Sequence, residues 1–241
     1  MTAENLYKTT LQPTRGTKLY KNGKNPLSIE FVTQDKSDIG PAVKNTLMII
    51  GKTLAKIGHM GIASKNGYKV RIPPNQHYMV INNGDYELDL YLDQDPAAHE
   101  VIYDPYLYEN KDLPTVDAKK FKEDNPVPPG YVDTLEKWYS VKFTYEDINY
   151  IFIRPQLGIS FQTHKMRQEH WEVGKGSPII VEGSKVHYET KPGDKFDMAL
   201  GSLHTVINPS KTKWILIKER YSGTFDEEDI ERVFNPNNYG N

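Results

Sequence analysis

Apolar residues in this chain come in short runs that alternate with polar residues. Examples are LSIEFV at 27–32, YELDLYL at 86–92, YSVKFTY at 139–145 and KWILIKERY at 213–221. A period of two is typical of a half-buried strand, because successive side chains of a strand point to opposite faces of the sheet. Turn dipeptides such as Asn83-Gly84 and Pro192-Gly193 separate the runs. The sequence therefore predicts an all-β fold built as sandwiches or barrels, with a few short helices.

Two segments depart from this pattern. Residues 109–133 are highly charged and contain four prolines, with one short helical stretch at 116–123. We expect a linker at 116–133, between a domain at 1–115 and a domain at 134–241. Near the end, Thr224-Phe-Asp-Glu227 has the spacing of a helix capping box, which predicts a helix with Ile230, Val233 and Phe234 on its apolar face.

Composition excludes several classes of function. The chain has no cysteine, so disulfides, thiolate chemistry and zinc fingers are excluded, and any metal must be held by His, carboxylate or amide groups. The formal charge is -2, and no basic stripe predicts a nucleic-acid partner. No apolar run approaches the roughly 18 residues of a membrane helix, and the N-terminus lacks the apolar stretch of a signal peptide. We expect a soluble, cytoplasmic protein without a membrane partner.

The stretch FQTHKMRQEHWEVGKG, residues 161–176, gathers side chains that hold metals or move protons. In a strand, Gln162 and His164 lie two residues apart and project from the same face. A kink or bulge at 165–168 would bring Glu169 back to that face. A fourth group must come from elsewhere, and the best candidate is His204, which follows a glycine turn and begins another strand.

An amide oxygen, two imidazoles and a carboxylate would form a site of mixed nitrogen and oxygen character. With two positions left for water or substrate, such a site suits a divalent ion: zinc first, with manganese, iron, cobalt or nickel as alternatives. The simpler interpretation is a polar strand with a structural histidine nearby.

Two spacings resemble the cupin superfamily, whose motifs read G-x5-H-x-H-x(3,4)-E-x6-G and G-x5-P-x-G-x2-H-x3-N. The matching residues are Gln162-x-His164-x4-Glu169-x6-Gly176 and Gly193-x5-Ala199-x-Gly201-x2-His204-x3-Asn208. The resemblance implies a double-stranded β-helix, or jelly-roll barrel, with Gln162, His164, Glu169 and His204 as metal ligands.

The stretches ISFQTHKMRQEHW and YSGTFDEEDIERV are similar to a narrower group, the type II mannose-6-phosphate isomerases. This resemblance implies a sugar-phosphate isomerase in which Arg167 and His170 lie at or near the sugar pocket. The sequence departs from the family at two arginines, which are Thr205 and Asn241 here. Two candidate phosphate partners are therefore lost, since a guanidinium fork is the usual bidentate partner of phosphate.

The first half repeats part of the pattern. GYKVRIPPNQHYMVIN, residues 67–82, has the spacing of the second cupin motif, with Tyr78 where the ligand histidine would stand. Earlier in the chain, Lys44 takes the place of the ligand glutamate. The chain thus resembles a bicupin, and 1–115 is predicted to be a degenerate cupin domain without metal ligands.

Two classes of function follow. The first is a metal-dependent aldose–ketose isomerase for a small sugar phosphate, with Arg167 or Lys165 as the phosphate partner. Its base is His170 or Glu169, and His170 is preferred if Glu169 binds the metal. The second is a non-catalytic cupin that binds a sugar or a partner; another metal-dependent cupin enzyme, such as an epimerase, lyase or dioxygenase, is a further alternative. Cupins pair through strand edges, so a homodimer is also expected.

Overall fold

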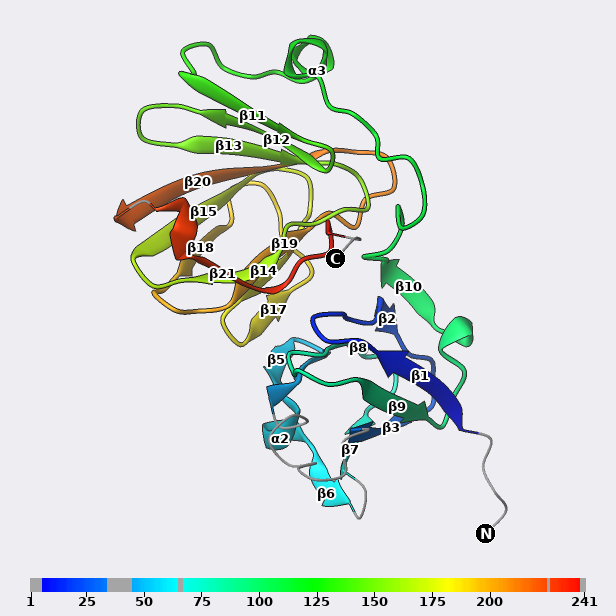
Figure 1. The fold of residues 1–241 in the computed structure, drawn as a ribbon. Coiled ribbons are helices and arrows are strands. Elements are labelled where there is room, and N and C mark those ends of the chain that lie inside the picture. Colours follow the sequence, from blue (N-terminus) through cyan, green and yellow to red (C-terminus); the bar gives the residue numbers. More distant parts are fainter. Residues whose placement is uncertain (1–5, 34–44, 65–66, 225, 239–241) are drawn as a thin grey trace. The chain divides into compact units, whose positions relative to one another are not determined.

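The computed structural model describes residues 6–33, 45–64, 67–224 and 226–238. The chain divides into two compact units, one made of Met1–Asp104 with Ser184–Val186 and one made of Pro105–Gly183 with His187–Asn241. Both units consist mainly of curled antiparallel sheets with few helices (Figure 1). The predicted all-β fold with a few short helices is confirmed. The domain boundaries at 115 and 134 stay a prediction.

The first unit contains two runs of neighbouring strands. One sheet has the order β1-β9-β3-β7-β6, with strands β1 Tyr7–Leu11, β3 Leu27–Thr33, β6 Ile62–Ser64, β7 Gly67–Ile72 and β9 Leu88–Leu92. The other run has the order β10-β2-β8-β4-β5, with strands β2 Leu19–Lys21, β4 Leu47–Ile50, β5 Thr53–Lys56, β8 His77–Ile81 and β10 Glu100–Tyr103. Two short helices complete it, α2 at Ile57–Met60 and η1 at Pro96–Ala98.

The core of the first unit is apolar where a cupin site would lie. Tyr78, at the position of the missing ligand histidine, is buried in this core, and its hydroxyl lies 2.7 Å from Nδ1 of His99. Tyr20 stacks on the Tyr78 ring. Lys44 lies outside the described residues. An aromatic cluster therefore fills the space around Tyr78.

The second unit contains a larger sheet with the order β11-β12-β13-β20-β15-β18. Its strands are β11 Asp133–Lys137, β12 Ser140–Thr144, β13 Asn149–Ile153, β15 Arg167–Lys175, β18 Lys195–Met198 and β20 Ile215–Gly223. The facing strands run in the order β16-β19-β14-β21, with β14 Phe161–His164, β16 Ile179–Glu182, β19 His204–Ile207 and β21 Ile230–Phe234. Strand β17 spans Lys185–His187, and helices α3 and η2 span Ala118–Asp124 and Glu227–Asp229.

Helix α3 decides which face of the larger sheet is polar. Phe121 of α3 packs on Phe143 and Phe152, on the outer face of β12 and β13 (Figure 1). Because these apolar side chains are buried outside, the alternate residues of β12, Ser140 and Lys142, face the space between the two sheets. The helix forms because Asp117 caps it, accepting hydrogen bonds from the backbone N–H groups of the first turn. Residues 118–124 thus pack within the second unit.

The prediction of a helix after Thr224 is wrong. The structure has a single 3₁₀ turn, η2, in which Asp226 accepts a hydrogen bond from the backbone N–H of Glu228. The following residues form β21, which pairs with β14 in the second unit. The local capping signal is real, but pairing with a neighbouring strand outweighs the weak helical preference of so short a segment. Ile230–Phe234 consequently becomes part of the wall beside the candidate site.

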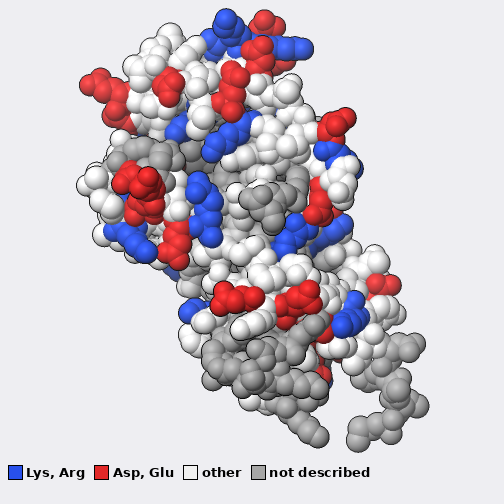
Figure 2. Space-filling model, in the orientation of Figure 1, with Lys and Arg blue, Asp and Glu red and all other residues white. Residues whose placement is uncertain are grey.

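Within the described residues, no helix is both long and apolar enough to cross a membrane. On the face shown in Figure 2, acidic and basic side chains are interspersed, in keeping with the formal charge of -2.

Gly223 ends β20 in a close approach that only glycine permits. Its φ is +102°, and a Cβ there would lie 2.4 Å from the carbonyl oxygen of Met166. We expect Gly223→Ala to lower the free energy of unfolding by about 1–3 kcal/mol beyond the control Gly193→Ala. Gly193 has a similar φ of +93°, but an added methyl group would meet no described atom within 4 Å. Urea unfolding of both variants measures the difference, and equal midpoints would contradict this account.

Candidate metal centre

Three buried ligand-type side chains meet inside the second unit. His164 ends β14, Glu169 lies in β15, and His204 begins β19. Their ligand atoms all lie within 4.8 Å of one another. Each side chain is at most 2% exposed. Three residues from two distant stretches of sequence therefore converge, as the spacing predicts.

Two local features bring these strands together. Gln162 of β14 pairs directly with His204 of β19 in the sheet. Between β14 and β15, the backbone N–H groups of Lys165 and Met166 donate to the two carboxylate oxygens of Asp229, at 2.9 and 3.0 Å. This tight turn reverses the chain, so that Glu169 returns to the interior in β15.

The protonation of His204 is set by the backbone. Its Nδ1 lies 3.0 Å from the carbonyl oxygen of Ser202, which can only accept, so Nδ1 carries the proton. Burial lowers the pKa of His204, which favours the neutral ring. Its Nε2 has no hydrogen-bond partner in the described part of the chain and lies 3.5 Å from Oε2 of Glu169. A bare nitrogen lone pair thus faces a carboxylate.

Glu169 is a buried carboxylate held in the charged state. Burial raises its pKa, but the hydrogen bond from His164, the proximity of both histidines and the hydrogen bond from Arg167 outweigh burial and lower the pKa to about 2. Oε1 accepts from Nε of Arg167 at 3.0 Å and Oε2 from the Trp171 indole at 3.1 Å. Both oxygens are therefore oriented by neighbours.

The donor set fits a divalent ion. A lone pair on Nε2 of His204 and an oxygen of Glu169 face each other without a proton between them, and a cation would satisfy both. Nε2 of His164 lies 3.1 Å from Oε1 of Glu169, within the spacing of ligands that share one ion. The Gln162 amide presents its nitrogen 3.5 Å from Nε2 of His164, while its oxygen accepts from Ser160. Rotating this amide by half a turn exchanges the two atoms and offers the oxygen as a ligand.

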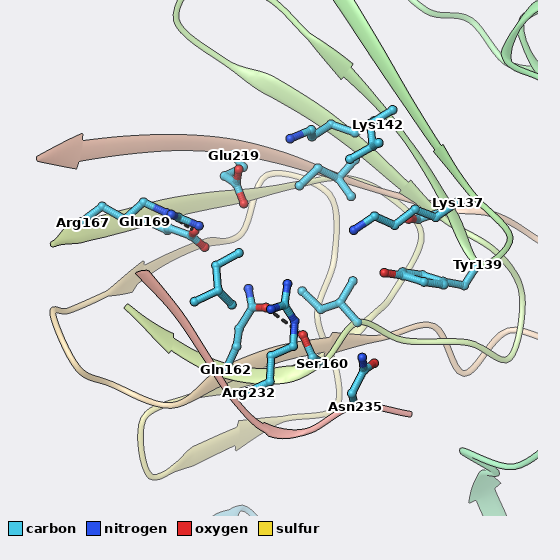
Figure 3. A pocket seen from close by; sticks show the side chains of 15 residues that line it. Lys137, Tyr139, Lys142, Ser160, Gln162, Arg167, Glu169, Glu219, Arg232 and Asn235 are labelled. Carbon is cyan, nitrogen blue, oxygen red and sulfur yellow. Dashed lines mark hydrogen bonds and ion pairs between the residues drawn. The ribbon is translucent and has the colours of Figure 1, made fainter. Parts of the chain in front are cut away.

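A pocket of about 120 Å³ opens beside the cluster. Figure 3 shows Glu169, Gln162 and Glu219 on one side of it, and Lys137, Lys142 and Tyr139 on another. Its lining residues are Leu135, Lys137, Tyr139, Ser140, Lys142, Ile151, Ile159, Ser160, Gln162, Arg167, Glu169, Glu219, Ile230, Arg232 and Asn235. Two candidate metal ligands, Gln162 and Glu169, thus line the same cavity as positively charged lysine and arginine side chains.

The three residues predicted to act in catalysis have different positions. Arg167 lies at the cluster, with Nη2 3.3 Å from Nε2 of His164. His170 lies on the opposite face of β15, partly exposed, with Nδ1 2.7 Å from Asp197. Lys165 is exposed and pairs with Glu231 at 3.2 Å. The structure brings Arg167 to the cluster but not His170, because alternate residues of a strand face opposite ways. Lys165 lies in the exposed turn between β14 and β15, outside both strands.

Glu219 is a pocket residue that sequence reasoning missed. Its pKa is raised to about 8, chiefly by burial and also by the negative charge of Glu169. The hydrogen bond from Asn149 and the positive charge of Lys142 lower the pKa but do not cancel the rise. The signal was present in KWILIKERY, where Ile215, Ile217 and Glu219 share one face of a strand. A carboxylate that continues an apolar face marks a special position.

Three further pocket residues were missed, the cations Lys137, Lys142 and Arg232. Lys142 alternates with Val141 and Phe143, which on sequence alone face the core and leave the lysine in solvent. Only the cover supplied by α3 reverses that interpretation. Arg232 lies in the segment predicted to be helical.

The second unit is thus a curled β unit with a buried His–Glu–His cluster. Residues 128–235 match the family model described as Mannose-6-phosphate isomerase C-terminal. The resemblance predicted for the second half of the chain is thereby confirmed.

Curated relatives match a shorter stretch of the chain. Mannose-1-phosphate guanylyltransferase ManC of Salmonella typhimurium is 30% identical over 82 residues, which cover 34% of this chain and 17% of the relative. Xanthan biosynthesis protein XanB of Xanthomonas campestris is 32% identical over 82 residues, with the same coverage of 34% and 17%. The chain thus covers less than a fifth of the length of these relatives.

Solved structures with similar folds include oxalate decarboxylase OxdC of Bacillus subtilis, in a mutant form. Its TM-score is 0.33 at 11% identity, covering 93% of this chain and 71% of that chain. A sugar phosphate isomerase from a cupin superfamily, from Silicibacter pomeroyi, has a TM-score of 0.31 at 14% identity. The match covers 39% of this chain and 74% of that chain.

We expect His164→Ala and His204→Ala to lose bound divalent metal, because each change removes one imidazole from a three-residue cluster. Elemental analysis of the purified proteins measures the metal stoichiometry. His59→Ala serves as the control, since His59 lies in α2 of the first unit and outside the cluster. Unchanged metal content in both cluster variants would refute the assignment.

Proposed function

We propose that the second unit is a metal-dependent aldose–ketose isomerase for a sugar phosphate. The observation that supports this most is the pocket lined by Glu169 of the His–Glu–His cluster together with the cations Lys137, Lys142 and Arg232. Such a pocket offers an ion for the sugar oxygens and positive charge for a phosphate. The names of the relatives, a mannose-6-phosphate isomerase domain and a mannose-1-phosphate guanylyltransferase, both point to phosphorylated mannose.

The ion would be held by His164, Glu169 and His204, with Gln162 as a fourth ligand; zinc is our first choice, with manganese, iron, cobalt and nickel as alternatives. When bound, it would supply electrostatic stabilisation of the negative oxygen that develops during isomerisation. The catalytic roles predicted for Arg167, His170 and Lys165 stay predictions.

The protein's own residues have separate tasks in this proposal. Arg167 holds Glu169 in position through its Nε, and its Nη1 donates to the carbonyl oxygen of Asp226 at 3.0 Å, which fixes the guanidinium. Lys137, Lys142 and Arg232 bind the phosphate and replace the arginines lost at positions 205 and 241. The predicted homodimer and cytoplasmic location also stay predictions.

We expect the metal-loaded protein to incorporate deuterium from D₂O into a hexose or pentose phosphate while converting aldose to ketose. Proton abstraction next to a carbonyl exchanges that hydrogen with solvent, so proton NMR of each candidate sugar phosphate detects turnover. His204→Ala is the control, because it removes a metal ligand. Absence of both exchange and ketose for every sugar phosphate, with metal bound, would overturn the proposed function in favour of a binding role.

A further inference from the structure

Glu219 occupies the pocket wall as the continuation of an apolar face. Ile215 and Ile217 of β20 point into the core of the second unit, and Glu219 follows them on the same face. Figure 3 shows its side chain reaching from β20 into the pocket near Glu169. On the other face of β20, Lys218 pairs with Glu172 instead. A carboxylate is therefore built into a position where an apolar residue would pack.

The contacts of Glu219 leave one oxygen available. Oε1 accepts a hydrogen bond from the Asn149 side-chain amide at 3.0 Å. Within the described residues, Oε2 makes no hydrogen bond. Asn149 lies opposite Glu219 in the β13–β20 ladder, so the amide fixes the carboxylate from a rigid neighbouring strand. One oxygen is anchored by Asn149, and the Glu219 side chain lines the pocket (Figure 3).

Glu169, the other carboxylate that lines the pocket, differs in this respect. Both of its oxygens are committed, one to Arg167 and one to Trp171, and both also face the histidines. A carboxylate so engaged, and bound to an ion, is a poor proton carrier. His170 is not an alternative, since it faces away on the outer side of β15.

We propose that Glu219 is the acid–base group that carries a proton between C1 and C2 of the sugar, an inference that rests on the proposed isomerase function. Oε2 takes the proton from C2 of the aldose; the C2–H electron pair becomes the C1–C2 double bond, and the carbonyl pair moves to O1. The hydroxyl proton then passes from O2 to O1, the O2 electron pair forms the ketone, and Glu219 returns its proton to C1. No oxidant or reductant is consumed.

The test compares metal-loaded wild type, Glu219→Gln and Glu219→Asp on the sugar phosphate that wild type isomerises. Glutamine keeps the shape and an acceptor for Asn149 but cannot carry the proton, whereas aspartate keeps the carboxylate. Glu172→Gln is the matched control, since it removes a carboxylate from a half-buried ion pair on the outer face of the same sheet. Metal content, kcat, KM and the isotope effect with C2-deuterated substrate are measured for each.

We expect Glu219→Gln to lower kcat by about 10²–10⁴-fold with metal content and KM close to wild type, and to enlarge the isotope effect. Glu219→Asp should retain part of kcat. Two results overturn the assignment while leaving the isomerase intact: a Glu219→Gln variant with unchanged kcat, or one that loses metal in proportion to kcat. A wild type without turnover of any sugar phosphate overturns the proposed function itself, and the role of Glu219 with it.

Discussion

The buried charge of Glu169 is the constraint on which the candidate site depends. A carboxylate that is 2% exposed would cost several kcal/mol if left without partners. Arg167 and Trp171 supply hydrogen bonds from the same face of its own strand, and His164 and His204 approach from two other strands. The interior of the second unit is thus organised around one negative charge that attracts cations.

A second constraint comes from the outside of the sheet. Because α3 buries the outer face of β12 and β13, polar residues of these strands face the pocket, which is where Lys142 and Asn149 meet Glu219. Alternate residues of β20 face the interior, so Ile215 and Ile217 enter the hydrophobic core and Glu219 follows them on the same face. Helix α3 therefore makes the pocket polar, although no α3 residue lines the pocket.

The sequence alone predicted the all-β fold and the three residues of the cluster, because strand period and motif spacing are local properties. It could not predict that α3 covers the larger sheet, so Lys142 passed as an ordinary strand residue, whereas the signal for Glu219 was present in KWILIKERY and was missed. The helix expected at Thr224 failed for a related reason, since pairing of β21 with β14 is a long-range interaction that no local capping signal reveals. His170 looked close to the site in sequence, but adjacent strand residues face opposite sides.

The central claim is that His164, Glu169 and His204 hold one divalent ion. A crystal structure of the protein loaded with manganese or zinc, with anomalous scattering recorded at the metal edge, tests it most directly. The account predicts one strong anomalous peak within bonding distance of Nε2 of both histidines and an oxygen of Glu169, at roughly 2.0–2.2 Å. A peak elsewhere, or none at this cluster with saturating metal, would contradict it.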